Sequence, residues 1–151
     1  MVLPEPLLER YKERHRFINS TVSKVDQMIV QKFIEEGYYE RHLNKTRALY
    51  KGRHDVLIRA LQEMNFDCKI AGEYAGVHLL MSFADHVSES ELVRRAENAE
   101  VKVYGLSDYC IGENHRSATI LLGYANLSEE EIREATAILK GVWTDIPGVK
   151  K

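Results

Sequence analysis

The chain has 151 residues, of which 44% are hydrophobic and 29% are charged, so length and composition fit one folded domain with a hydrophobic core. Its formal net charge of −2 excludes a general electrostatic attraction to nucleic acid or to anionic membranes. No apolar run approaches the roughly 20 residues that span a bilayer, and the charged N-terminal stretch lacks the apolar core of a signal peptide, so we expect a cytoplasmic protein.

Two helices are expected in the first 36 residues. Apolar residues at near-helical spacing after Pro6 predict a short amphipathic helix over residues 5–18. Ser20 or Thr21 is then expected to cap a second helix, which ends at Gly37. The residues expected to face inward on this second helix are Val25, Met28, Ile29 and Phe33.

A third, long helix is predicted from Tyr38 to Met64, where apolar and aromatic residues recur at steps of three, four and seven. Its polar positions include Arg41, His42, Lys45, Arg47, Lys51, Arg53, His54 and Arg59. Acidic residues interrupt this basic series, so we interpret it as a solvated face rather than as a nucleic-acid site.

After Asp67 the hydrophobic period changes to two, which indicates strands. "CKIAGEY" and "AGVHLLMSF" are expected to pair as a hairpin that reverses at Ala75-Gly76, and "VKVYGL" and "ATILLGYA" are expected to be a third and a fourth strand. The segments that begin at Ser88 and Ser128 have the spacing of capping boxes and open two helices.

The predicted fold is therefore α+β. N-terminal helices, one of them long, precede a small, mainly antiparallel sheet in the order β-β-α-β-β-α, with helices packed on one face.

The sequence contains no complete set of catalytic residues. The six histidines lack the spacing of a zinc site, and neither a GxSxG elbow nor a glycine-rich phosphate loop is present. Cys68 and Cys110 are expected to be buried, reduced thiols. We therefore expect no catalytic residue and no metal site in the chain alone.

Five stretches in order resemble the C-terminal part of the MocR-type regulators of the GntR family, whose effector half is an aminotransferase-like module of fold type I. They are "VLPEPLLERY", "DQMIVQKFIEEGYYERHLNKTRALYKGRHDVL", "AGVHLLMSF", "SESELVRRAENAEVKVYGLSDY" and "ILLGYANLSEEEI". The second stretch carries the most specific pattern, G-x-x-x-R-H-x-x-x-x-R-x-x-Y-x-x-R-H, which begins at Gly37.

The resemblance implies a division of the chain and a set of missing parts. Residues 1–36 would come from the edge of a large domain, and residues 37–151 would form the whole small domain. In such proteins the large domain carries the lysine that binds pyridoxal 5′-phosphate, and a separate winged-helix domain binds DNA. By this analogy neither is present here, so the chain alone is expected to bind neither ligand tightly, whereas the full parent would bind the cofactor and form a homodimer.

The resemblance also implies candidate site residues. Ser20, Thr21 and Ser23 fall where a dimer of this fold approaches the partner subunit's cofactor phosphate, although each can serve instead as a helix cap. Leu121 occupies the position of the arginine that commonly holds the substrate carboxylate, which disfavours an ordinary α-amino-acid aminotransferase. Arg116 can approach the same pocket from its loop, or simply be exposed there.

Two other interpretations stay open. The chain can be the small domain of a true aminotransferase, which lacks an upstream winged helix. Alternatively, it can be a free-standing interaction module that has lost the large domain.

Overall fold

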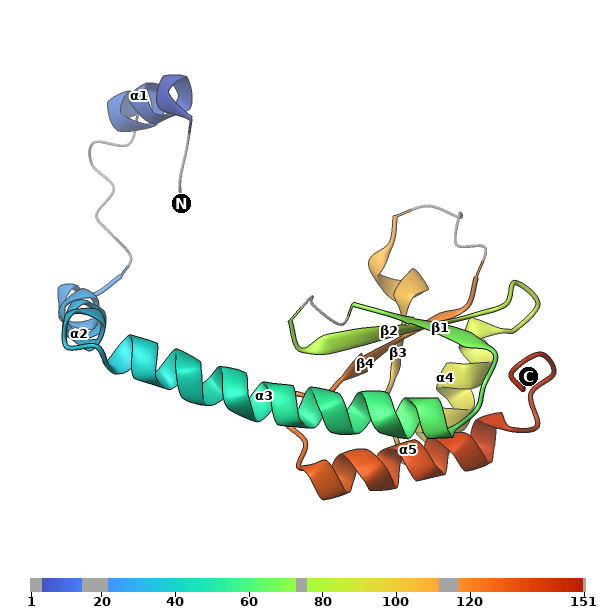
Figure 1. Cartoon of the computed structure of the whole chain (residues 1–151). Coiled ribbons are helices and arrows are strands. Elements are labelled where there is room, and N and C mark those ends of the chain that lie inside the picture. Colours follow the sequence, from blue (N-terminus) through green and yellow to red (C-terminus); the bar gives the residue numbers. More distant parts are fainter. Residues whose placement is uncertain (1–3, 15–21, 73–75, 112–116, 151) are drawn as a thin grey trace. The chain divides into compact units, whose positions relative to one another are not determined.

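The computed structural model describes residues 4–14, 22–72, 76–111 and 117–150 of the chain. Its internal contacts define two compact units, residues 1–43 and residues 44–151 (Figure 1).

The first unit contains helices α1 (Glu5–Arg14) and α2 (Lys24–Glu35). The N-cap of α2 is Ser23, whose Oγ accepts a hydrogen bond from the Val25 N–H at 3.1 Å. The prediction that Ser20 or Thr21 caps this helix was therefore wrong, because Ser23 stands directly before the first helical residue. Residues 15–18, the end predicted for the first helix, lie outside the described residues, as do Ser20 and Thr21.

The apolar face predicted for α2 is present but is not buried. Its four residues Val25, Met28, Ile29 and Phe33 are 40–63% exposed. Phe33 stacks on Tyr38 with ring centroids 6.1 Å apart, yet one such neighbour cannot bury a whole helix face. The inward orientation predicted for these residues is thus wrong for this chain.

Gly37 separates α2 from the long helix α3 (Tyr38–Glu63), as predicted. Its φ of +73° belongs to the left-handed region that glycine adopts without strain. Within the second unit, α3 buries Leu57 and Leu61, so the far end of the helix is the part that packs on a core.

The second unit is built on a four-stranded sheet in the order β1-β2-β4-β3, and every neighbouring pair is antiparallel. The strands are β1 (Cys68–Ala71), β2 (His78–Phe83), β3 (Tyr104–Gly105) and β4 (Thr119–Gly123). The predicted hairpin of β1 and β2 is confirmed, although Ala75 of its predicted reversal lies outside the described residues.

The third predicted strand is much shorter than expected. The Val101 N–H bonds to the Ala96 carbonyl at the end of a helix, and a 3₁₀ helix, η1 (Leu106–Tyr109), begins directly after Gly105. Only two residues of "VKVYGL" are therefore left to pair with β4.

Both predicted capped helices are present, as α4 (Glu89–Asn98) and α5 (Glu129–Trp143). The Ser128 Oγ accepts from the Glu131 N–H at 3.2 Å, and the Glu131 carboxylate accepts from the Ser128 N–H at 2.7 Å, which completes a capping box. At α4 the Ser88 Oγ accepts from the Glu91 N–H, but the Glu91 carboxylate binds Arg94 and Arg95 instead.

One face of the sheet and helices α3, α4 and α5 enclose the core (Figure 1). Trp143 is fully buried, its Nε1–H donates to the Leu92 carbonyl at 2.9 Å, and its ring meets Phe83 edge-on. The α+β prediction is confirmed. Cys68 and Cys110, in contrast, are half-buried rather than buried.

Candidate functional site

The two faces of the sheet differ in composition and exposure. Alternate side chains of the central strands point into the helix-covered core; these are Leu79, Met81, Phe83, Ile120 and Leu122. Because neighbouring side chains in a strand point to opposite faces, the residues between them form the other face. We call this second surface the outer face.

A single row of uncharged side chains crosses the outer face. The strand register pairs Ala71 with Leu80, Leu80 with Leu121, and Leu121 with Tyr104, so the row runs through all four strands. Leu80 and Leu121 are half-buried, while Ala71 and Tyr104 are exposed at the two edges. Leu121, which occupies the position that the family resemblance assigns to a carboxylate-binding arginine, is thus an apolar residue in the middle of the outer face.

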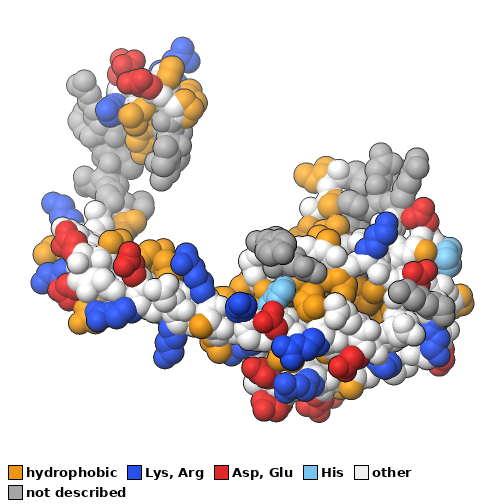
Figure 2. Space-filling model, in the orientation of Figure 1, with side chains coloured by type: hydrophobic (Ala, Val, Ile, Leu, Met, Phe, Trp, Pro, Cys, Tyr) orange, Lys and Arg blue, Asp and Glu red, His pale blue; other side chains and the backbone are white. Residues whose placement is uncertain are grey.

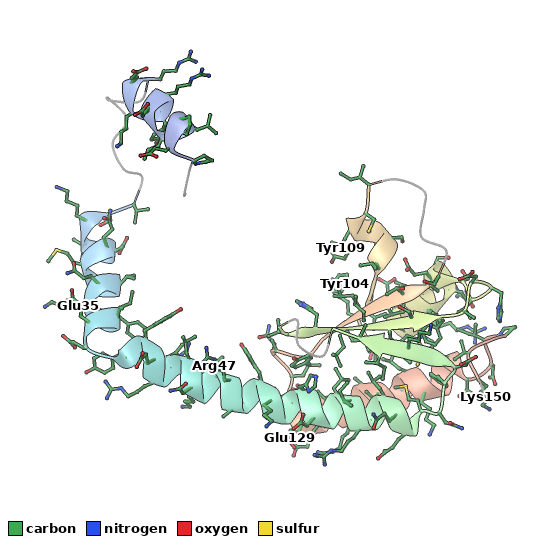
Figure 3. The ribbon with its side chains drawn as sticks, turned by 45° about the horizontal axis from the view of Figure 1, so that its top comes forward. Glu35, Arg47, Tyr104, Tyr109, Glu129 and Lys150 are labelled. Carbon is green, nitrogen blue, oxygen red and sulfur yellow. The ribbon has the colours of Figure 1, made fainter. Side chains whose placement is uncertain are left out.

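An aromatic pair lies at the β3 end of the row. Tyr104 and Tyr109 project from β3 and η1 with ring centroids 6.3 Å apart (Figure 3). The Lys102 ammonium lies 5.3 Å from the centre of the Tyr104 ring, within range of a cation–π interaction. The Lys102 ammonium at this edge of the sheet therefore rests on an aromatic ring.

Polar groups lie to either side of the row. Toward one end of the strands, Lys69, Ser82 and Thr119 share a register position, and the Ser82 and Thr119 hydroxyls are 2.9 Å apart. Toward the other end of the strands, His78 is paired with Gly123 and is exposed.

Glu89 connects three elements at the margin of the sheet. Its carboxylate accepts hydrogen bonds from the Ser107 N–H at 3.2 Å, from the Ser107 hydroxyl, and from the Thr119 N–H at 3.0 Å. Gly105 leaves room for this carboxylate, because a β-carbon there would collide with it. Glu89 therefore fixes η1 and β4 to the first turn of α4, where the helix dipole also favours a negative charge.

The motif that begins at Gly37 has a structural role that its residues did not reveal. Arg53 Nη1 donates to the Ala125 carbonyl just after β4, and the His54 ring meets the Tyr124 ring edge-on. Tyr124 in turn donates its O–H to the Gly76 carbonyl at 2.7 Å, and burial raises the pKa of its phenol. Arg53 and His54 are thus not part of a solvated face, and that interpretation was wrong for them.

A sequence signal for this contact did exist. Tyr50, Arg53, His54, Leu57 and Leu61 follow one another at steps of three, one, three and four, which places them on one face of α3. Because Arg53 and His54 lie on the same helix face as Leu57 and Leu61, the sequence could have predicted that they pack against the core.

The structure brings only one of the proposed site residues into view. Ser23 is exposed and caps α2, and its Oγ accepts a hydrogen bond from the Val25 N–H. Ser20, Thr21 and Arg116 lie outside the described residues. In the part of the chain that is described, no group of three or more His, Cys, Asp or Glu residues could hold a metal ion.

The fold is that of part of an aminotransferase. Alpha-aminoadipate aminotransferase LysN from Thermus thermophilus superposes with a TM-score of 0.76 and 23% sequence identity, over 95% of this chain and 36% of that one. That structure was solved with N-(5′-phosphopyridoxyl)-L-leucine bound.

In sequence, the chain is similar to transcriptional regulators along nearly its whole length. The HTH-type regulator YhdI of Bacillus subtilis (strain 168) is 33% identical over 147 residues, which are 97% of this chain and 31% of the relative. The probable rhizopine catabolism regulatory protein MocR of Rhizobium meliloti is 27% identical over 147 residues. No family model matches the chain.

The resemblance to MocR-type regulators is therefore confirmed, and the chain is similar in sequence to part of such regulators and in fold to part of an aminotransferase. It spans about a third of the length of the curated relatives that it matches. Among the described residues, no helix is both long and apolar enough to cross a membrane.

Proposed function

We propose that this chain is the C-terminal portion of the effector half of a pyridoxal phosphate-dependent regulator. In this proposal residues 37–151 form the small domain, and residues 1–36 belong to the edge of a large domain that carries the cofactor lysine. In this proposal the domain boundary lies at Gly37, directly before α3, so the whole of α3 belongs to the small domain. The observation that supports the proposal most strongly is the similarity to regulators over 97% of the chain.

Two exposed apolar surfaces support a missing partner within the same protein. The apolar residues of α2 are exposed among the described residues of the first unit, and hydrophobic side chains, in orange, are visible at several places on the surface (Figure 2). The row through Leu80 and Leu121 lies on the sheet face opposite the helices. Contiguous apolar surface of this kind is typical of a face that another part of the protein covers.

The proposed role is to turn ligand binding into a change of domain orientation. The small domain would close with its outer face toward the ligand, and a ligand favours closure only if it binds the closed form more tightly than the open one. Leu121 would then present an uncharged side chain to the ligand, so the charge of the ligand would be met by other residues, of which Arg116 is our candidate.

For the cofactor, the residues present offer only a partial fit. While the Ser23 oxygen accepts the Val25 N–H, its own hydrogen remains able to donate to a phosphate group, as the proposed role of Ser20, Thr21 and Ser23 requires. The row on the outer face contains no lysine, so the lysine and the carboxylate that the cofactor needs would come from the rest of the protein.

In the full protein we also propose homodimers, DNA binding through a separate winged-helix domain, and a cytoplasmic location. A second candidate is the small domain of a true aminotransferase. The aromatic-amino-acid aminotransferase 1 of Thermococcus litoralis, 26% identical over 109 residues, favours it.

The coding sequence that precedes residue 1 tests the proposal and separates the two candidates. The regulator requires a winged-helix segment followed by a lysine-bearing large domain, and the aminotransferase requires the large domain alone. On the protein itself, pyridoxal phosphate is added to the 151-residue chain, followed by borohydride. We expect no stoichiometric covalent adduct. Such an adduct would overturn the proposal that the cofactor lysine lies outside these 151 residues.

A further inference from the structure

The second unit contains a hollow beside helix α3. It has a volume of about 710 Å³ and lies where α3 passes the turn before β2 and the end of β4. Its wall includes Arg47, Tyr50, Lys51, His54, Gly76 and Tyr124. The size is within the range of pockets that hold small organic molecules.

The wall opposite α3 is firmly held. The Tyr124 N–H donates to the Val77 carbonyl at 3.2 Å, and the Tyr124 hydroxyl donates to the Gly76 carbonyl at 2.7 Å. These two bonds tie the turn before β2 to the end of β4. The hollow is therefore bounded by fixed backbone on that side rather than by side chains alone.

The α3 wall presents positive charge. Arg47, Lys51 and His54 are separated by four and three residues, so they share one face of the helix. Figure 3 marks Arg47 on α3. Among the residues that the structure describes, no carboxylate forms an ion pair with Arg47 or Lys51. Within the described part of the chain, two cations at one hollow are thus held by no ion pair.

His54 adds an unused polar atom. Its Nδ1 lies 3.2 Å from the Asp55 carboxylate, whereas its Nε2 is buried and has no hydrogen-bond partner among the described residues. A buried polar atom without a partner is unusual and costs free energy. Asp55, which is also in the wall, is 43% exposed and lies against Nδ1, so its single negative charge leaves the wall with an excess of positive charge.

We propose that this hollow binds a small organic anion through a carboxylate or phosphate group. Arg47 and Lys51 hold the anionic oxygens by charge-assisted hydrogen bonds, and the His54 Nε2, which is an acceptor while Nδ1–H donates to Asp55, takes the hydrogen of a phosphate hydroxyl. The Tyr50 ring lies beside the remaining part of the molecule. The site is formed by the 151-residue chain itself and does not depend on the proposed regulator.

The test is an NMR titration of the 151-residue chain with inorganic phosphate in one series and benzoate in another. Sodium chloride keeps the ionic strength constant, since screening alone changes the resonances of exposed cations. We expect saturable shifts at Arg47, Lys51, His54 and Tyr124. Saturation with phosphate only, with benzoate only, or with both identifies the preferred anionic group, and each of these results supports the site.

Variants distinguish a built site from general attraction to the basic helix. Arg47→Ala and Lys51→Ala should each weaken binding by about tenfold. Lys45→Ala and Arg59→Ala remove one exposed lysine and one exposed arginine of the same helix outside the hollow, and should leave the affinity unchanged. Arg47 and Lys51 are exposed, so thermal melts of their variants should match the parent chain.

A second substitution addresses the imidazole. His54→Gln should reduce the affinity for phosphate but not for benzoate, which has no hydroxyl to donate, while the saturable shifts at Lys51 persist. The proposal is overturned if neither anion gives saturable shifts, or if the two control variants lose as much affinity as Arg47→Ala and Lys51→Ala do.

Discussion

The imidazole of His54 meets the phenol ring of Tyr124 edge-on, with the ring centroids 5.9 Å apart. This contact joins the long helix α3 to the end of β4, and the Tyr124 hydroxyl extends the connection to the Gly76 carbonyl. The most specific motif of the sequence thus serves to fix α3 against the sheet. Edge-to-face ring pairs of this kind add roughly 0.5–1.5 kcal/mol beyond the area that they bury.

Removing the Tyr124 hydroxyl should weaken this connection without emptying the core. Tyr124→Phe leaves the Gly76 carbonyl without its donor, so we expect the free energy of unfolding to fall by about 1–2 kcal/mol. Urea denaturation followed by circular dichroism measures the change. Tyr109→Phe removes the same hydroxyl from a side chain that is 62% exposed, and its midpoint should stay at that of the parent. Equal losses in the two variants would contradict the role given to Tyr124.

Trp143 should be a sensitive position of the core, since it is fully buried. Trp143→Phe removes the donor to the Leu92 carbonyl and leaves space beside Phe83. Because an unpaired buried carbonyl and a partial cavity both destabilise, we expect a loss of about 2–4 kcal/mol. The chain has no other tryptophan, so circular dichroism rather than fluorescence must follow unfolding. Ala137→Ser, at an exposed position of the same helix, should cost less than about 0.5 kcal/mol.

The sequence predicted those parts of the fold that repeat along the chain. The alternation in β2 placed Leu79, Met81 and Phe83 on the core side correctly, and the serines at 88 and 128 marked helix starts. These patterns are local, since each depends on the geometry of one element. The family resemblance, which uses residue identities over the whole chain, was needed to identify the kind of protein.

Features that depend on contacts between distant elements were missed. Thr136 occupies a buried position because other elements cover that face of α5, and its hydroxyl can lie there because it donates to the Ile132 and Arg133 carbonyls of its own helix. The predicted burial of α2 was wrong for a different reason, since no element among the described residues of its unit covers the apolar face. The polar wall formed by Lys51 and His54 likewise becomes visible only when the turn before β2 is placed beside α3.

The capping box of α5 should make stability depend on pH in the acid range. Hydrogen bonds from the Ser128 backbone and hydroxyl, and the nearby positive charge of Arg53, lower the pKa of Glu131 below its ordinary value of 4.5. A carboxyl whose folded-state pKa is depressed adds stability above its unfolded-state pKa. That contribution is lost as the pH falls through the folded-state value, because both states are then protonated.

We therefore expect Glu131→Gln to lose less stability than the parent chain when the pH is lowered from 7 toward 3. Urea midpoints measured at several pH values would show the smaller slope. Ser128→Ala should reduce the slope by less than Glu131→Gln does, since the backbone N–H of residue 128 still donates to the carboxylate. An unchanged slope in Glu131→Gln would contradict the role assigned to this carboxylate.

Neighbouring residues of β4 provide a direct test of the two sheet faces. Ile120 is fully buried in the core, whereas Leu121 lies half-buried on the outer face between Leu80 and Tyr104. Ile120→Ala should therefore cost about 2–5 kcal/mol, as expected for a large-to-small change in a core. Leu121→Ala should cost about 1 kcal/mol, because part of that side chain is in contact with water even in the folded chain.

Substitution by arginine should distinguish Leu121 from Ile120 more clearly than substitution by alanine. Leu121→Arg should leave a folded chain with a cooperative urea transition, because a guanidinium on the outer face can stay hydrated while its methylene groups lie along the sheet. Ile120→Arg would place an unpaired charge in the core and should abolish the transition. If both arginine variants unfolded the chain, the outer face would be covered in solution and could not be the surface that meets the ligand.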